Sequence, residues 1–431
     1  MNTKALVDVL RRARESGIRK GDGGLEWTRF NAAWRIETDK NIYDDLIKIL
    51  HENPDLIEFN EKMMNTSKSG SCRVTYENLA KSLLCRTLEV GEEQTVSELK
   101  KYIELEFTPA LNILALSGIQ VDEKVDLWGE IGLVPFESIP DCMMKDLYKA
   151  TDSMFNDTRN LLTIGFNYGT PKSALIKRIE IKPKFHETFD GNDAGFRKYL
   201  RNNELSTESL NDVEEFSQVY NCLSLVGSSA PVALAFWTVI EEWVPCSNMF
   251  QNFRIGGIEH DMSNASAYKL TPEDCKNASI FIRKYFELPN NIRELLRISL
   301  QRLNLFRRRR SLVDKAIDLG IALEVLLLHD GGPDIPISLP FRLRGAWLLG
   351  QDTASRHDYY RLFKEIYACR CEAVHSGKFD SKFTKKLSLP IHELLKKGDE
   401  LCVNIIKWII EQKRFPDWEK LLLGDMSLQA K

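Results

Sequence analysis

The sequence contains no long hydrophobic run and no segment with the pattern of a secretory signal. Its most apolar stretch, APVALAFWTVI over residues 230–240, is about half as long as the roughly 20 residues that a membrane-spanning helix requires. The N-terminal segment is amphipathic and charged, and it lacks the apolar core of a signal peptide. We therefore expect no membrane span, and we predict that residues 230–240 form a buried core element.

The sequence also lacks paired cysteine motifs and a strong excess of charge. Its nine cysteines are scattered without the C-x-x-C spacing of a zinc site, and their number is odd. We therefore expect reduced thiols, a cytoplasmic location, no metal site and no cofactor. The formal net charge of −3 excludes a general attraction to nucleic acid, so any such contact must come from a local basic patch.

What is present is a chain of 431 residues, 43% hydrophobic and 28% charged, which is typical of folded globular proteins. Several domains are expected, because this length exceeds what one core usually organises. We predict an α+β N-terminal region followed by an all-α C-terminal helical bundle. The segments are a mixed α/β region over residues 1–152, an α+β continuation or second domain over residues 153–265, and the bundle over residues 266–431.

The first 265 residues combine helical and strand patterns. Amphipathic helices are predicted within residues 7–17, 42–54 and 76–90. Isoleucines at 176, 179 and 181 with charges between them indicate a half-buried strand, and a polar, loop-rich segment is expected over residues 190–209. No catalytic or binding motif is evident in this region, so its ligand is not predicted.

The C-terminal segment shows helical periodicity. Apolar residues recur at spacings of three and four in Leu312, Ala316, Leu319, Leu323 and Leu326. Thr271 and Ser311 are each followed three residues later by aspartate, which is a typical start of a helix. Further helices are predicted around residues 341–350, 356–377 and 388–414. This pattern favours a bundle of four or five helices.

An arginine and a histidine stand five positions apart near the end of the helix predicted over residues 356–377. The apolar stripe of this helix includes Tyr367, and Arg370 continues it. On a regular helix His375 lies about 140° from Arg370 around the axis, so the two side chains converge only if the helix ends or bends between them. Gly377 is a suitable C-terminal stop.

An arginine and a histidine without metal ligands suit phosphoryl transfer within RNA. Histidine, with an ordinary pKa of about 6.5, can remove the proton of a 2′-hydroxyl or protonate a leaving 5′-oxygen near neutral pH. Arginine donates hydrogen bonds to the charge that develops on the phosphate. The products would carry 2′,3′-cyclic phosphate and 5′-hydroxyl ends, and DNA would resist. The spacing alone is weak evidence, since such pairs near helix ends are more often capping or solvated residues.

Three ordered blocks of sequence strengthen this interpretation. They are KAIDLGIALEVLLL with the A-L-E core ending in Glu324, LRGAWLLG with Arg344, and the set Tyr367, Arg370, Val374, His375 and Gly377. Together they resemble a HEPN domain of the Apea-like kind over about residues 270–412, whose hallmark is an R-x(4 to 6)-H motif. One departure is Cys371, where the family usually has a small polar or amide residue, because a thiol donates only weakly.

The resemblance implies a metal-independent endoribonuclease whose bundle forms a homodimer. Two R-x(4 to 6)-H motifs would share one cleft, and Arg370 of one subunit could meet His375 of the other. The implied partners are RNA, with tRNA as one candidate, and a phage-derived or other activator at the N-terminal region. The implied biological setting is bacterial anti-phage defence by abortive infection, or a toxin.

Supporting residues and alternatives follow from the same blocks. Glu324 is expected to pair with Arg370 or another arginine, in a structural or a catalytic role, and Arg344 to touch phosphate or pair with Glu324. The basic run Arg307, Arg308, Arg309 and Arg310 either binds RNA or forms a solvated helix end. The alternatives are a non-catalytic HEPN module for binding or dimerisation and, with less support, an N-terminal enzyme with a helical regulatory tail.

Overall fold

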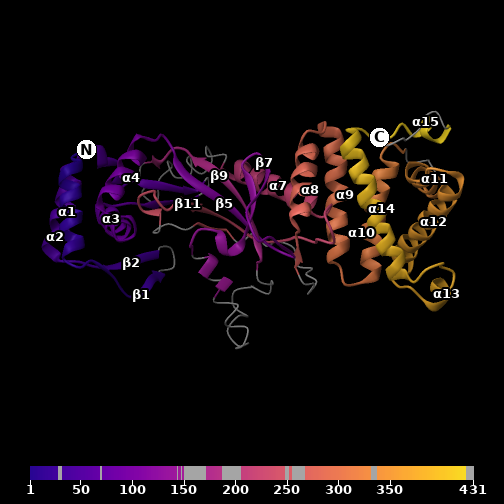
Figure 1. Ribbon diagram of the computed structural model, residues 1–431, viewed down its shortest axis with the longest axis horizontal. Helices are drawn as coiled ribbons and strands as arrows, with labels where there is room; N and C mark the ends of the chain where they lie inside the picture. The colour runs from indigo at the N-terminus through magenta and orange to yellow at the C-terminus, as the bar shows by residue number, and fades with distance from the viewer. Residues whose placement is uncertain are drawn as a thin grey trace, which may run out of the picture.

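The helices and strands lie in three groups along the longest axis of the molecule (Figure 1). These are a set of N-terminal helices, a central β-sheet and a C-terminal helical bundle. The structure is a computed structural model that describes residues 1–27, 32–67, 70–142, 144–146, 148–149, 171–186, 205–247, 252–254, 267–331 and 337–423. The expected fold class, an α+β region followed by an all-α bundle, is confirmed.

The N-terminal group is built around four amphipathic helices. Its elements are α1 (Thr3–Glu15), β1 (Arg19–Trp27), β2 (Ala32–Glu37), α2 (Lys40–His51), the 3-10 helix η1 (Pro54–Phe59), β3 (Met63–Ser67), β4 (Gly70–Arg73), α3 (Tyr76–Val90) and α4 (Glu92–Glu104). The buried faces of the helices meet in one core that includes Leu10, Leu50, Leu83 and Leu99. The helices α1, α2 and α3 confirm the three amphipathic helices predicted for this region.

The central sheet has six strands among the described residues, in the order β12-β11-β5-β9-β8-β7 with every neighbouring pair antiparallel. The elements from residue 108 to residue 269 are β5 (Thr108–Ser117), β6 (Ile119–Gln120), β7 (Val125–Trp128), β8 (Ile131–Pro135), η2 (Phe136–Ser138), β9 (Ser173–Ile181), β10 (Phe185–His186), α7 (Leu205–Leu223), β11 (Val232–Ile240), β12 (Asn252–Arg254) and β13 (Tyr268–Lys269). Of these, β10 pairs with β3 and β13 pairs with β6, outside the six-stranded sheet. Every residue of β11 is buried, which confirms the core element predicted over residues 230–240.

The sheet crosses the boundary predicted at residue 152. Strand β5 precedes this boundary, whereas β9 and β11 follow it and both pair with β5 along most of its length. Residues 1–152 and 153–265 therefore contribute to one sheet. The polar segment expected over residues 190–209 lies partly outside the described residues, and its last part is helical because α7 begins at Leu205.

The bundle follows strand β13. Its helices are α8 (Pro272–Phe286), α9 (Asn290–Arg308), α10 (Leu312–Leu328), α11 (Ser338–Leu349), α12 (Thr353–Ser376), α13 (Ser381–Thr384), α14 (Ile391–Gln412) and α15 (Trp418–Leu423). Two predicted starts are confirmed, since Thr271 accepts a hydrogen bond from the backbone of Asp274 and Ser311 caps α10 in the same way. Local capping signals thus place the helix starts correctly.

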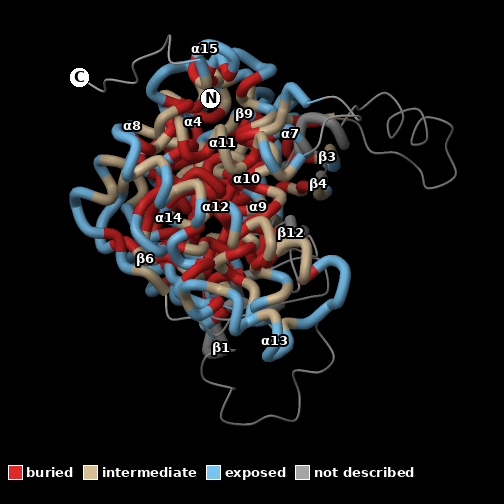
Figure 2. Tube along the Cα trace, turned by 90° about the vertical axis from the view of Figure 1, so that its right-hand side faces the viewer, coloured by how far each residue is buried: buried red, intermediate tan, exposed pale blue. Residues whose placement is uncertain are grey.

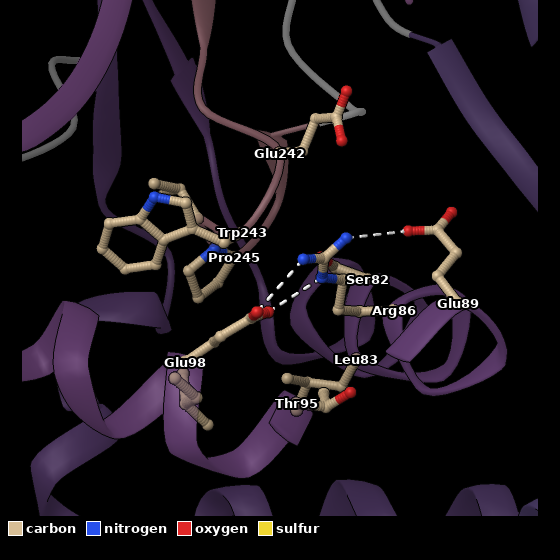
Figure 3. A pocket seen from close by; sticks show the side chains of 11 residues that line it. Ser82, Leu83, Arg86, Glu89, Thr95, Glu98, Glu242, Trp243 and Pro245 are labelled. Carbon is tan, nitrogen blue, oxygen red and sulfur yellow. Dashed lines mark hydrogen bonds and ion pairs between the residues drawn. The ribbon is translucent and has the colours of Figure 1, made fainter. Parts of the chain in front are cut away.

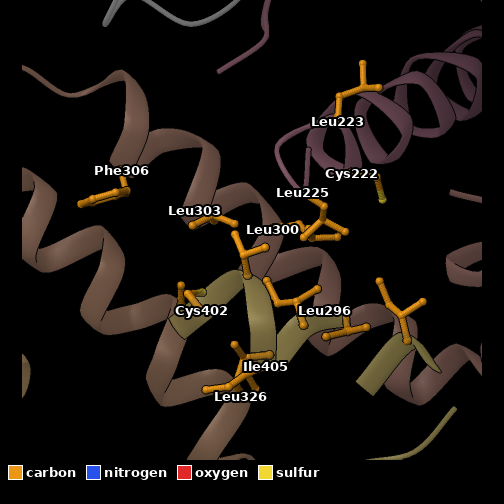
Figure 4. Packing of buried hydrophobic residues seen from close by; sticks show 14 of the residues in the cluster. Cys222, Leu223, Leu225, Leu296, Leu300, Leu303, Phe306, Leu326, Cys402 and Ile405 are labelled. Carbon is orange, nitrogen blue, oxygen red and sulfur yellow. The ribbon is translucent and has the colours of Figure 1, made fainter. Parts of the chain in front are cut away.

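The sheet and the bundle share one hydrophobic core. Leu225 after α7, Leu300 on α9 and Ile405 on α14 belong to the same buried cluster (Figure 4). Seen from the bundle end, buried residues run through α9, α10 and α14, whereas α13 is largely exposed (Figure 2). Burial of apolar surface, at about 25 cal/mol per Å², therefore holds the bundle against the sheet.

Candidate functional site

Arg370 reaches the bundle interior because a glycine on the facing helix leaves room for it. A Cβ atom at Gly320 on α10 would lie 2.3 Å from Cγ of Arg370 and 2.9 Å from its Cβ, far closer than normal contacts. The Arg370 side chain on α12 therefore crosses α10 where the latter has no side chain. The helix accepts this glycine despite its cost of about 1 kcal/mol relative to alanine.

Replacement of Gly320 by alanine is accordingly expected to lower the free energy of unfolding by about 1–3 kcal/mol, because the new methyl group collides with Arg370. Equilibrium urea unfolding would measure this change. In an Arg370→Ala background the same substitution should cost clearly less, since Cγ is gone. Equal costs in both backgrounds would show that contact with the Arg370 side chain beyond its Cβ atom is not the cause.

Arg370 forms an ion pair with Glu324 of α10. Its Nε lies 3.1 Å from Oε1 of Glu324, and its Nη2 donates a hydrogen bond to Oε2 at 3.1 Å. The two side chains are 26% and 20% exposed, so the pair is partly accessible to solvent. Burial raises the pKa of Glu324, while the charge and the hydrogen bond of Arg370 act in the opposite direction. Of the two partners expected for Glu324, the structure shows Arg370.

Tyr367 lies one turn before Arg370 on the same side of the bundle. Its ring packs against Phe341 of α11 with 5.3 Å between ring centroids. Burial raises the pKa of the Tyr367 hydroxyl, and the neighbouring Cys371 thiol, which hydrogen-bonds to it, adds to this effect. The unusual cysteine therefore contacts the tyrosine one turn earlier in α12.

His375 lies on the exposed last turn of α12. The helix continues without a break to Ser376, and Gly377 ends it with a φ of 64° while donating its N–H to Ala373. The predicted stop is therefore confirmed. Because the helix is regular between Arg370 and His375, their side chains diverge by about 140°, and a single chain does not bring them together.

Arg344, which was expected to touch phosphate or to pair with Glu324, has Asp330 as its ion-pair partner. Its guanidinium forms an ion pair with Asp330 and donates to the carbonyl of Leu327 at 2.7 Å. The same group lies 4.9 Å from the centre of the Trp418 ring on α15. Arg344 therefore connects α11 with the end of α10 and with α15. It does not pair with Glu324.

Arg307, in the basic run at the end of α9, makes internal contacts that link three parts of the chain. These contacts form what we call the Arg307 joint. Arg307 Nε donates to Asp399 of α14 at 3.0 Å, and its Nη1 donates to the carbonyls of Ser224, Gly227 and Ser229 before β11. The Arg307 side chain is only 8% exposed. These contacts hold α9, α14 and the α7–β11 connection together.

The rest of the run divides between interior and surface. Arg308 is 1% exposed, Arg309 pairs with Asp318 of α10 at 2.9 Å, and Arg310 is exposed. Burial of Arg307 and Arg308 corrects the expectation that these two side chains bind RNA. A buried guanidinium cannot reach a phosphate in solution, and its high desolvation cost is offset by the internal contacts instead.

Glu324 and Arg344 also line a pocket between α10 and α11. This pocket has a volume of about 320 Å³ and opens to solvent. A second cavity lies in the N-terminal group, where Arg86 donates two hydrogen bonds to Glu98 and one to Glu89 (Figure 3). Its volume is about 20 Å³, which leaves room for roughly one water molecule, so it is not a ligand site.

Comparison with protein-family models, with curated proteins and with solved structures gives no match for this chain. Within the described ranges, no three histidine, cysteine, aspartate or glutamate residues are grouped so that they could hold a metal ion. The helices of those ranges also include none with the length and apolar character of a membrane span. The site must therefore be interpreted from its own geometry.

Sequence reasoning missed several residues that shape this site. These residues are Gly320, Asp330 and Asp399. Gly320 leaves space for the side chain of Arg370, Asp330 binds Arg344, and Asp399 binds Arg307. A glycine inside the apolar stripe of α10 was an available signal, because such a glycine often marks a close helix approach. Asp399 gave no local signal, since its partner lies 92 positions away.

Proposed function

We propose that this protein is a metal-independent endoribonuclease of the HEPN type that uses Arg370 and His375. The observation that carries the proposal is that one helix, α12, has a half-buried arginine, held by Glu324, and an exposed histidine on its last turn. The arginine has a fixed position on an all-α bundle, and the histidine is open to a substrate. Hydrogen-bond donors that are already in position stabilise the negative charge that develops on a phosphate during the reaction.

In the proposed reaction His375 removes the proton of a ribose 2′-hydroxyl, and the resulting oxygen attacks the adjacent phosphorus. The bond to the 5′-oxygen breaks, and the leaving oxygen takes a proton from the imidazolium formed at His375 or from water. The guanidinium of Arg370 donates to the phosphate oxygens while their charge increases. The products are a 2′,3′-cyclic phosphate and a 5′-hydroxyl, so a DNA strand is not cut.

Because the two side chains diverge within one chain, the proposal includes a symmetric dimer. In such a dimer Arg370 of one subunit faces His375 of the other, and each subunit contributes to two equivalent sites. The exposed apolar side chain of Val374, which is 48% accessible, lies next to His375 and suits a contact surface at this end of α12.

Mixing two inactive variants tests this arrangement. When Arg370→Ala and His375→Ala subunits are unfolded together and refolded as a mixture, about half of the dimers are mixed and each has one complete site. We expect about one quarter of the wild-type cleavage rate, measured on labelled RNA. An activity that stays at the level of the separate variants would argue for a site within one chain.

We further propose that the N-terminal region responds to an activator and restrains the bundle until it binds. The continuous core between sheet and bundle and the Arg307 joint provide a route for such control. Unrestrained RNA cleavage harms the host, so a cytoplasmic role in anti-phage defence or as a toxin would follow. RNA, with tRNA as one candidate, would be the target.

A second candidate function is a non-catalytic module for binding or dimerisation. The ion pair with Glu324 favours it, because a paired arginine has less positive charge to offer a phosphate. Incubation of the purified protein with tRNA and total RNA in the presence of EDTA separates the two. Cleavage with cyclic-phosphate ends would support the nuclease, and intact RNA, with and without phage lysate as a source of activator, would support the binding module.

A further inference from the structure

The pocket between α10 and α11 is built like a small-molecule site. Its walls are mainly aliphatic and include Val325, Leu328, Ile337 and Pro340. Its volume of about 320 Å³ lies at the lower end of the roughly 300–1,000 Å³ typical of ligand pockets, so it suits a small ligand. Apolar walls of this kind match the faces of a heterocyclic ring.

Polar groups converge on the same pocket. Glu324 and Arg344 line it together with His329, whose ring packs against Phe415 with 3.9 Å between centroids and a tilt of 37°. Burial raises the pKa of Glu324 and lowers that of His329. The guanidinium of Arg344 is already engaged by Asp330 and the Leu327 carbonyl. Each carboxylate oxygen of Glu324 has one contact with Arg370 and can accept a second hydrogen bond, so Glu324 provides an acceptor at a largely apolar wall.

Glu324 links the pocket to the candidate catalytic arginine, which is its ion-pair partner and is not itself part of the pocket lining. Glu324 lines it and at the same time holds Arg370 at 3.1 Å. A ligand that fills the pocket and extends past Glu324 therefore meets the guanidinium group. A nucleotide has this form, because its flat base is joined through the ribose to a phosphate.

We propose that this pocket binds the base of the nucleotide next to the phosphate held by Arg370, and that it selects bases with an exocyclic amino group. This inference rests on the proposed RNA cleavage. An ionised carboxylate only accepts hydrogen bonds, so it favours the amino edges of adenine, guanine and cytosine. Uracil places carbonyl oxygens on both sides of its N–H, and these oxygens repel the carboxylate.

Binding of the four nucleoside 3′-monophosphates to the whole purified protein tests the inference, measured by calorimetry and by saturation-transfer NMR. The adenine, guanine and cytosine compounds should bind about tenfold or more tightly than the uracil compound. Glu324→Gln should reduce this ratio to near one. Equal affinity for all four in the wild-type protein, or no binding of any of them, would overturn the proposal.

Variants that fill the pocket locate the binding. Val325→Trp and Ile337→Trp should each abolish the affinity, and the second is the safer variant because Ile337 is 49% exposed. Ile280→Trp on α8 is the matched control, since Ile280 is 39% exposed and lies outside the pocket lining. Binding that survives in both pocket variants would place the ligand elsewhere and refute the assignment.

Cleavage assays separate this inference from the proposed function. If RNA stays intact but the nucleotides bind selectively, the base pocket stands and the nuclease assignment falls. If RNA is cut with equal frequency next to all four bases, the nuclease assignment stands and the selective pocket is refuted. Cutting that avoids uracil in the wild-type protein, and loses this preference in Ile337→Trp, would support both.

Discussion

Replacement of Arg370 or His375 by alanine is expected to lower the rate of RNA cleavage by about 10²–10⁴-fold. Loss of His375 removes the group that accepts the 2′-hydroxyl proton, and loss of Arg370 removes donors to the charged phosphate. Initial rates on end-labelled RNA, with the ends identified chemically, would measure both effects. The surviving products should still carry 2′,3′-cyclic phosphate, since the route of cleavage is unchanged.

Two variants on exposed positions serve as controls for this experiment. Arg361→Ala removes an exposed arginine from the same helix, and His392→Ala removes an exposed histidine from α14. Both should cut RNA at the wild-type rate. If Arg370→Ala and His375→Ala also retain that rate, the R-x-x-x-x-H pair has no catalytic role and the binding-module interpretation becomes the better one.

Arg370 has a structural role that must be separated from catalysis. Arg370→Ala leaves Glu324 half-buried without its partner, so some loss of stability is expected. Arg370→Lys keeps the positive charge but loses the forked geometry that serves both the carboxylate and a phosphate. A folded Arg370→Lys protein with strongly reduced cleavage would show that the guanidinium itself is needed.

Replacement of Arg307 by alanine is expected to lower the free energy of unfolding by about 3–5 kcal/mol. The change leaves Asp399 without its counter-charge and removes the donor shared by the carbonyls of Ser224, Gly227 and Ser229. Ser224 and Ser229 are buried at the contact of bundle and sheet, where their carbonyls have little access to water, whereas Gly227 is exposed. Equilibrium urea unfolding followed by circular dichroism would measure the loss.

Arg310→Ala is the matched control, because Arg310 is exposed and only three positions away. Its effect should stay within about 0.5 kcal/mol, as for most surface substitutions. A double-mutant cycle with Asp399→Asn would then isolate the ion pair. An Arg307→Ala protein as stable as Arg310→Ala would mean that the internal joint contributes nothing measurable.

The helical part of the fold was predictable because its signals are local. Thr271, Ser311 and Gly377 act on backbone groups within four residues, and the apolar stripe of α10 depends only on the helical repeat. The burial of residues 230–240 was predictable for a similar reason, since a continuous apolar run admits no exposed face, but only the structure showed that they form the strand β11.

The partners of the arginines were not predictable in the same way. Two carboxylates on or just after α10 could each pair with either of two arginines. The packing of the helices determined that Glu324 pairs with Arg370 and Asp330 with Arg344. The basic run at the end of α9 was visible in the sequence, but its burial depended on Asp399 and on a connection about 80 residues earlier. Charge alone does not distinguish a surface that binds RNA from an internal joint.

The sequence by itself determined the residue types of the candidate site, the helix that carries them and the glycine that ends this helix, because these depend on local backbone chemistry. Only the tertiary structure decided that Arg370 points inward past Gly320 to Glu324 while His375 faces solvent. The physical reason is that a side chain on a helix becomes buried or exposed only when another helix packs against one face of that helix.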